Sequence, residues 1–237
     1  MSQPNQTGSE VVLILSPEKL NAWKSNSEVF EDSATSPARQ VRSLIMNPTL
    51  LVTANDGIGG GWIKSFANVE RLELWDFFRL VDPIPTASFA PFHALPSVKS
   101  LSLTLTTAPS LEAVNLIRSL PLLEDLGINA LNTEIDAIDG DIPQPLEPPR
   151  LTGTLHLHSG MKRVENILSH VPVPDGLRFR KIILDADSLE EEEELEYAPD
   201  LVERCSNTLE YIQIRRFKLG ELFPHGGSMF DVNICPL

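Results

Sequence analysis

A short apolar template recurs along this chain at a nearly constant interval. In the stretch NVERLELW, residues Val69, Leu72 and Leu74 follow the spacing V-x-x-L-x-L, which is typical of a short strand with one buried face. Similar stretches are SVKSLSLT, LLEDLGIN, RFRKIILD and TLEYIQIR. One strand of this kind is compatible with many folds. A repeated strand restricts the chain to architectures that stack copies of one unit.

The last two apolar positions of the template measure the interval between copies. Successive first positions are separated by 28, 29, 25, 29, 27 and 30 residues, a mean of 28. Six such similar intervals predict a structural repeat, because chance alternation produces only one or two of them. The seven pairs are Leu44/Met46, Leu72/Leu74, Leu101/Leu103, Leu126/Ile128, Leu155/Leu157, Ile182/Leu184 and Ile212/Ile214. Leu13 and Leu15 form a weaker eighth copy.

Segments with helical spacing lie between several of these strands. We predict helices within 110–120, 160–170 and 192–205, with Ser110 as a helix cap and Pro199 as an interruption. Each unit is then a strand, a turn and a helix. Such a unit cannot bury its apolar face alone, so neighbouring units stack and their template residues form one continuous buried ladder.

The L-x-x-L-x-L strand, the helix and the period near 28 resemble the leucine-rich repeat. More narrowly, VVLILSPEKLNAW, ARQVRSLIM, FANVERLELW, LPSVKSLSL and LPLLEDLGI are similar to the divergent repeats that follow the F-box in fungal F-box proteins. The resemblance implies an α/β solenoid, a horseshoe arc with parallel strands on the concave face and helices on the convex face. It also implies that the repeats hold a protein substrate, while the F-box docks on the adaptor of a cullin-type ubiquitin ligase.

Two departures from that family shape the expectations. No L-P-x-E-I-like F-box segment precedes Val11, so we expect an F-box-less or truncated relative that holds substrate without docking on the adaptor itself. The Asn or Cys usual three residues after the last template position is also missing, which predicts irregular repeats without the usual side-chain ladder. Its places hold Thr49, Phe77, Thr106, Leu131, Gly160, Asp187 and Phe217.

The expected division of the chain follows from the extent of the repeats. We expect a disordered polar tail over residues 1–9, a solenoid of seven to eight irregular repeats over 10–217, and a tail or partial cap over 218–237. Solenoid ends need covering, because each end otherwise exposes an apolar face and an unpaired strand edge. The apolar residues that would fold over the last repeat are Leu222, Phe223, Met229 and Phe230.

Composition excludes several classes of function. The formal net charge of -14 argues against nucleic-acid binding, which draws its affinity from clustered Lys and Arg. No secretory signal or membrane-spanning apolar stretch is readable, and Cys205 and Cys235 form neither a disulfide framework nor a zinc ligand set. We therefore predict an intracellular protein, cytoplasmic or nuclear, with a protein partner and no membrane.

Alternation along each strand predicts the binding surface. The template residues point inward, so the residues between and beside them face outward on the concave sheet. Trp, Tyr and Arg are the side chains most often found at interface hot spots. Our candidate partner-binding residues are Arg71, Glu73, Trp75, Asn129, His156, His158, Asp185, Tyr211 and Arg215. The alternative is that Trp75 packs under the loop DFFRLVDP and Tyr211 under the C-terminal tail.

Two further features of the sequence invite a binding role. His156 and His158 lie two residues apart on one strand face, and with Asp185 or Asn129 they approximate a metal-ligand set. Exposed histidines beside buried leucines are the commoner outcome, so we predict no metal. The acidic run DADSLEEEEELE (185–196) lacks the spacing of a calcium loop, and we expect a solvated loop or frayed helix start rather than a contact for a basic partner.

No catalytic site is readable. The glycines of LLVTANDGIGGGW resemble the cofactor turn of short-chain dehydrogenases, yet Ala54 replaces the first glycine and no Y-x-x-x-K follows. In PHGGSMF, the G-x-S-x-G elbow around Ser228 is broken by Phe230. We therefore predict a non-enzymatic protein-interaction module without a cofactor, the substrate-recognition arm of an F-box-type receptor. The alternatives are a ubiquitin-independent scaffold, or an enzyme that binds a nucleotide cofactor at Gly57–Gly61.

Overall fold

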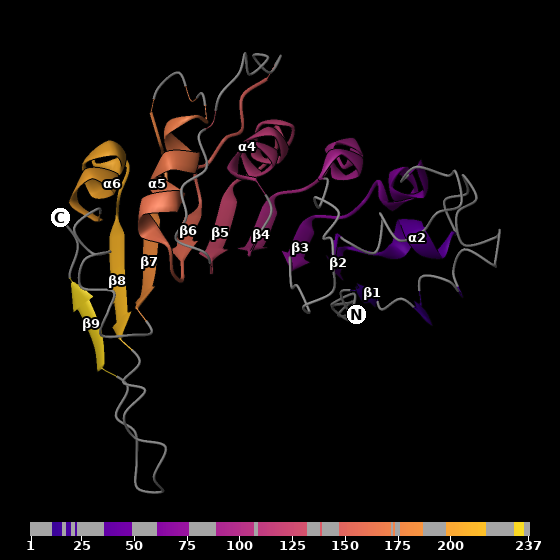
Figure 1. Cartoon of the computed structure of the whole chain (residues 1–237), viewed down its shortest axis with the longest axis horizontal. Coiled ribbons are helices and arrows are strands. Elements are labelled where there is room, and N and C mark those ends of the chain that lie inside the picture. Colours follow the sequence, from indigo (N-terminus) through magenta and orange to yellow (C-terminus); the bar gives the residue numbers. More distant parts are fainter. Residues whose placement is uncertain are drawn as a thin grey trace, which may run out of the picture.

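In the computed structural model the chain folds into one β-sheet, parallel except for its last strand, with helices packed against it (Figure 1). The structure describes residues 11–15, 18–19, 22, 36–48, 61–75, 89–106, 109–131, 138, 147–171, 173, 176–186, 198–216 and 230–234. Within these ranges the sheet has nine strands, ordered as they occur in the chain. The chain therefore has an α/β fold.

The first eight strands run parallel, each hydrogen-bonded to the next one in the chain. They are β1 (Val12–Leu15), β2 (Ser43–Met46), β3 (Arg71–Trp75), β4 (Ser100–Leu105), β5 (Asp125–Ala130), β6 (Thr154–Leu157), β7 (Lys181–Ala186) and β8 (Tyr211–Arg216). Each predicted template pair lies in one of these strands, and the weaker eighth copy is β1. The strand prediction is confirmed at every copy.

The register of the sheet aligns the template positions. Leu13 pairs with Leu44, and the same row continues through the first template residue of every later strand. These residues are Leu72, Leu101, Leu126, Leu155, Ile182 and Ile212. Because a one-residue slip would turn every apolar side chain to the other face, the buried leucines themselves fix this register.

The described helices lie on one face of the sheet (Figure 1). They are α2 (Pro37–Gln40), the 3-10 helices η2 (Gly61–Phe66) and η3 (Ala90–Ala94), α4 (Ser110–Arg118), α5 (Met161–Ser169) and α6 (Ala198–Cys205). The predictions for 110–120 and 160–170 are confirmed by α4 and α5. The helix predicted within 192–205 is present as α6, which contains Pro199 near its start, where a missing backbone N–H is tolerated, while residues 192–197 lie outside the described part of the chain.

The core lies between the sheet and this helical layer. Leu72, Leu101 and Leu126 are each 1% exposed, and Phe66 of η2, Phe92 of η3 and Phe179 are fully buried in the same core. Burying one such side chain stabilises the fold by about 1.5–3 kcal/mol. Since each copy contributes its own leucines and an aromatic or branched residue, stability is distributed along the sheet.

A repeated backbone hydrogen-bond pattern joins the strands where they begin. The carbonyl oxygen of Glu70 accepts hydrogen bonds from the N–H groups of Lys99 (2.8 Å) and Ser100 (3.0 Å). Lys99 in turn accepts from Glu124 and Asp125 in the same way. The turn entering each strand is therefore held by the turn before it, which satisfies backbone groups without a side-chain ladder.

A ninth strand, β9 (Phe230–Ile234), pairs antiparallel with β8. The sequence predicted only a tail or partial cap over 218–237, because FDVNI does not carry the template. Phe230 lies in this strand, whereas Leu222, Phe223 and Met229 lie outside the described residues. Pairing with β9 satisfies the outer edge of β8, which would otherwise present unpaired N–H and C=O groups.

Candidate functional site

The face of the sheet opposite the helices, which we call the open face, carries every predicted partner-binding residue. Along β3 the alternation is clear, since Leu72 and Leu74 are buried, Arg71 and Trp75 on either side of them are exposed, and Glu73 between them is half-buried. The same alternation runs along β4 and β5, whose open-face residues are partly exposed. The geometry of a pleated strand therefore places these side chains away from the core.

Strand β3 groups three of the candidates. Arg71, Glu73 and Trp75 occupy alternate positions of one strand and so share the open face. The indole Nε1–H of Trp75 donates a 2.6 Å hydrogen bond to Glu73 Oε1, and 36% of the tryptophan surface stays exposed. The segment 76–83, under which Trp75 was expected to pack in the alternative interpretation, lies outside the described residues.

Asn129 on β5 is engaged within the protein. Its Oδ1 accepts a 2.7 Å hydrogen bond from the hydroxyl of Ser159, which also lies 3.3 Å from the carbonyl oxygen of Ala130. Ser159 follows β6, so this contact ties the ends of two neighbouring strands. Sequence reasoning missed Ser159 because it lies beyond the three positions read for each strand.

Tyr211 on β8 is partnered by a residue that the candidate set omitted. Lys181 on β7 is its register neighbour, and the Lys181 Nζ lies 5.1 Å from the centroid of the Tyr211 ring. A cation over an aromatic face at this distance is attracted by the ring quadrupole. Tyr211 is half-buried, so its outer surface remains available beside a positive charge.

Four other candidates converge at the carboxyl ends of β6, β7 and β8. His156 Nε2 lies 2.6 Å from Asp185 Oδ2, and His158 Nδ1 lies 3.2 Å from the same oxygen. The two imidazole centroids are 4.1 Å apart. Arg215 reaches the other carboxylate oxygen, with its NH1 3.8 Å from Asp185 Oδ1. We call these four residues the histidine–aspartate cluster.

Asp185 is buried, whereas the alternation had predicted an exposed residue. Its side chain is 5% exposed, against 29% for both His156 and Arg215 and 37% for His158. The three longer side chains lie around the short carboxylate and cover it. A buried carboxylate is costly unless it is paired and hydrogen-bonded. The histidines satisfy Oδ2, but Asp185 Oδ1 and Arg215 Nε are buried without a hydrogen-bond partner.

Burial contradicts the expected exposure at three further open-face positions. Ser43 is 7% exposed on β2, Ile183 is 7% exposed on β7, and Gln213 is 8% exposed on β8. In the register, Ile183 lies between His156 and Gln213, so its neighbours on both sides shield it. The open face is therefore more accessible on β3 to β6 than on β7 and β8.

Several sequence features lie outside the described residues. These are Gly57 to Gly60 of the glycine-rich stretch, residues 187–196 of the acidic run, and Ser228. Gly61, the last glycine of that stretch, begins η2. Within the described part of the chain, no helix has the length and hydropathy required to cross a bilayer.

Comparison with family models, with curated proteins and with solved structures finds no match for this chain.

Proposed function

We propose that this chain is a non-enzymatic protein-binding module, built as a leucine-rich-repeat-like solenoid, whose open face holds the partner. One observation carries the proposal. The described helices lie on one face of the sheet, while the opposite face keeps Arg71 and Trp75 exposed beside polar neighbours. A sheet face with accessible aromatic and Arg side chains suits protein recognition. Such side chains bury a large area on binding and lose little conformational entropy.

The repeated geometry supports the solenoid part of this proposal. Strands follow one another in chain order, their template residues are in register, and the turn before each strand repeats the same backbone hydrogen bonds. Each of these features recurs with the sequence period, as expected when one supersecondary unit stacks on the next. A partner would then contact several repeats at once.

The open face also indicates the chemistry of the partner. Arg71, Glu73 and Trp75 on β3 offer a cation, an anion and an aromatic ring, and β4 adds the small polar residues Ser102 and Thr104. Such a mixed surface fits a folded protein or peptide with both charges better than a uniformly charged polymer. Recruitment to a ubiquitin ligase is the narrower form of the proposal, and it rests on the sequence resemblance to F-box proteins.

The test compares captured proteins between matched variants. Affinity purification with mass spectrometry would use the wild-type chain, the open-face variant R71S/W75S/Y211S and a control variant, K162S/E203S, changed at exposed positions of α5 and α6. We expect the open-face variant to lose the partner and the control to keep it. Loss of hot-spot residues costs about 2 kcal/mol or more each, which is about 30-fold in Kd.

Other outcomes would contradict parts of the proposal. Circular dichroism and a thermal melt first establish that both variants fold. Retention of the same partners by the open-face variant would refute the assigned face, and the absence of any enriched partner would refute a protein-binding role. Ligase subunits among the captured proteins would support the narrower form, and a captured partner without them would refute it. A fluorescence or calorimetric signal on adding a nicotinamide cofactor would instead favour the enzymatic alternative.

A further inference from the structure

The histidine–aspartate cluster has the donor set of a transition-metal site. Imidazole nitrogen and carboxylate oxygen are the ligands that zinc and its first-row neighbours take in proteins, and three protein ligands with one open position are typical of non-structural zinc sites. His156, His158 and Asp185 each offer one such atom, and the three atoms lie within 4.8 Å of one another. Hard ions such as Mg²⁺ prefer oxygen ligands, so two imidazoles select against them.

The distance from each imidazole to Asp185 requires only a small adjustment to accept an ion. With metal–ligand distances of about 2.0–2.2 Å, tetrahedral ligand atoms lie roughly 3.4 Å apart. The His158–Asp185 distance of 3.2 Å already matches this value. His156 lies 2.6 Å from the same oxygen, so this pair must open by under an ångström, which a side-chain rotation provides. Both imidazoles are partly exposed, so an ion can enter from solvent.

The surroundings of Asp185 orient it for this role. Its two oxygens face different partners, since Oδ2 faces both imidazoles and Oδ1 faces the guanidinium of Arg215. A cation held on Oδ2 would be bound by one oxygen, while the guanidinium of Arg215 pairs with Oδ1 at 3.8 Å by charge and without a hydrogen bond. The guanidinium charge also opposes the cation, so binding should be weaker than at the same ligands without it.

The buried carboxylate is the observation that separates this cluster from two surface histidines. Asp185 is buried, and its carboxylate lies against two imidazoles through Oδ2 and against the guanidinium of Arg215, without a hydrogen bond, through Oδ1. The sequence brought His156 and His158 together with Asp185 or Asn129 as an approximate ligand set, but it predicted no metal because exposed histidines beside buried leucines are the commoner outcome, and the burial of Asp185 could not be read. We infer that His156, His158 and Asp185 bind one divalent transition-metal ion of the zinc class, with water completing the coordination.

The experiment uses the full chain without a histidine tag, stripped with a chelator and dialysed against Zn²⁺ or Co²⁺. We expect one ion per chain, with Co²⁺ giving the intense visible absorption of low-coordinate nitrogen and oxygen ligation. His156→Asn and His158→Asn should each weaken binding by more than about 100-fold, since even the loss of an outer partner costs about 10–100-fold. His170→Asn is the matched control, because this histidine ends α5 and should leave binding unchanged.

Two results would overturn the inference. One is a wild-type chain that binds no Zn²⁺ or Co²⁺, which would leave the cluster as an internal ion-pair network. The other is binding that survives in the double variant H156N/H158N. If the variants fail to fold, NMR of the imidazole nitrogens in the wild-type chain decides, since the chain has 5 histidines to assign. Zinc must then shift His156 and His158; shifts confined to other histidines would refute the site.

Discussion

At the scale of single residues, Gly160 shows how one position controls the passage from strand to helix. It precedes α5 with a backbone φ of 70°, in the left-handed region. A Cβ added there would lie 2.4 Å from the carbonyl oxygen of Ala130 in the neighbouring repeat. A residue with a side chain therefore does not fit at this position without a shift of Ala130.

Gly160→Ala should therefore destabilise the protein more than the same change at another left-handed glycine. The matched control is Gly176→Ala, where φ is 80° but the nearest atom to an added Cβ is 3.7 Å away. The backbone conformation alone costs about 1–2 kcal/mol at each site, and Gly160→Ala adds the displacement of Ala130. Urea unfolding measures the stability of both variants. Equal losses of unfolding free energy would show that the contact with Ala130 does not contribute to the effect.

At the scale of elements, a buried polar contact joins α4 to α5. Arg163 on α5 is 2% exposed, and its Nε donates a 3.2 Å hydrogen bond to the hydroxyl of Ser110 on α4. The sequence predicted Ser110 as a helix cap. The structure places Pro109 at the cap and leaves Ser110 in the first turn, where its hydroxyl accepts from the next helix instead. The capping prediction was wrong, since periodicity gives no sign of a partner 53 residues away.

Ser110→Ala should lower the free energy of unfolding by about 1–3 kcal/mol, because it leaves a buried charged donor without this acceptor. Ser169→Ala is the control, since the Ser169 hydroxyl makes an exposed hydrogen bond to Asn166 within its own helix. We expect Ser169→Ala to change the free energy of unfolding by no more than about 0.5 kcal/mol. Denaturant unfolding of both variants checks the difference, and a neutral effect at Ser110 would show that Arg163 relies on other acceptors.

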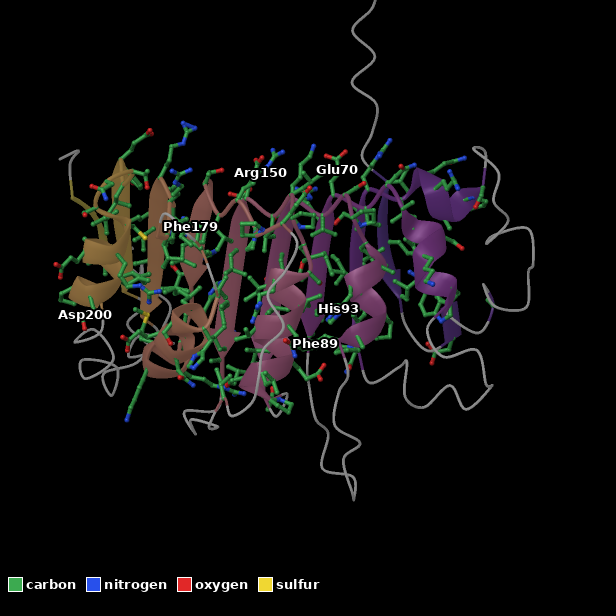
Figure 2. All side chains as sticks on the ribbon, turned by 90° about the horizontal axis from the view of Figure 1, so that it is seen from above. Glu70, Phe89, His93, Arg150, Phe179 and Asp200 are labelled. Carbon is green, nitrogen blue, oxygen red and sulfur yellow. The ribbon has the colours of Figure 1, made fainter. Side chains whose placement is uncertain are left out.

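At the scale of the whole molecule, charges alternate along the edge where the strands begin. Glu70 lies 3.8 Å from Arg42 and 3.1 Å from Lys99, and the pattern continues with Glu124 and Arg150 at 3.4 Å. Figure 2 shows Glu70 and Arg150 along the same edge. Each pair is exposed and individually weak. Their joint effect is to oppose a shifted stacking of repeats, because a slip by one repeat would bring like charges together.

Glu70→Lys should destabilise the fold by about 0.5–1 kcal/mol at low salt, since it places a third cation between Arg42 and Lys99. Glu210→Lys is the control, because Glu210 occupies the equivalent turn but pairs with Arg180 at 3.7 Å in a more exposed setting. The difference should shrink at high ionic strength. Urea titrations at two salt concentrations measure it, and a salt-independent loss at Glu70 would rule out an electrostatic origin.

The sequence predicted the repeating part of this molecule well and the remainder poorly. Strand positions and register followed from the leucine period, because the leucines of each strand must be buried whatever the rest of the chain does. The burial of Asp185 on β7 depends on His156 and His158 from the end of one neighbouring strand and Arg215 from the other, which no local pattern encodes. β9 was missed because the stretch FDVNI does not carry the apolar template of the other strands.

The antiparallel direction of β9 bears on how such a chain can lengthen during evolution. A tandem duplication adds a parallel strand, and such a strand fits wherever its neighbours on both sides are parallel. Between β1 and β8 every junction accepts that addition, with the same leucine row continuing through it. Beyond β8 the strand edge is already paired with β9, which runs in the opposite direction. Duplications should therefore add new strand units between β1 and β8 and leave the β8–β9 pair unchanged.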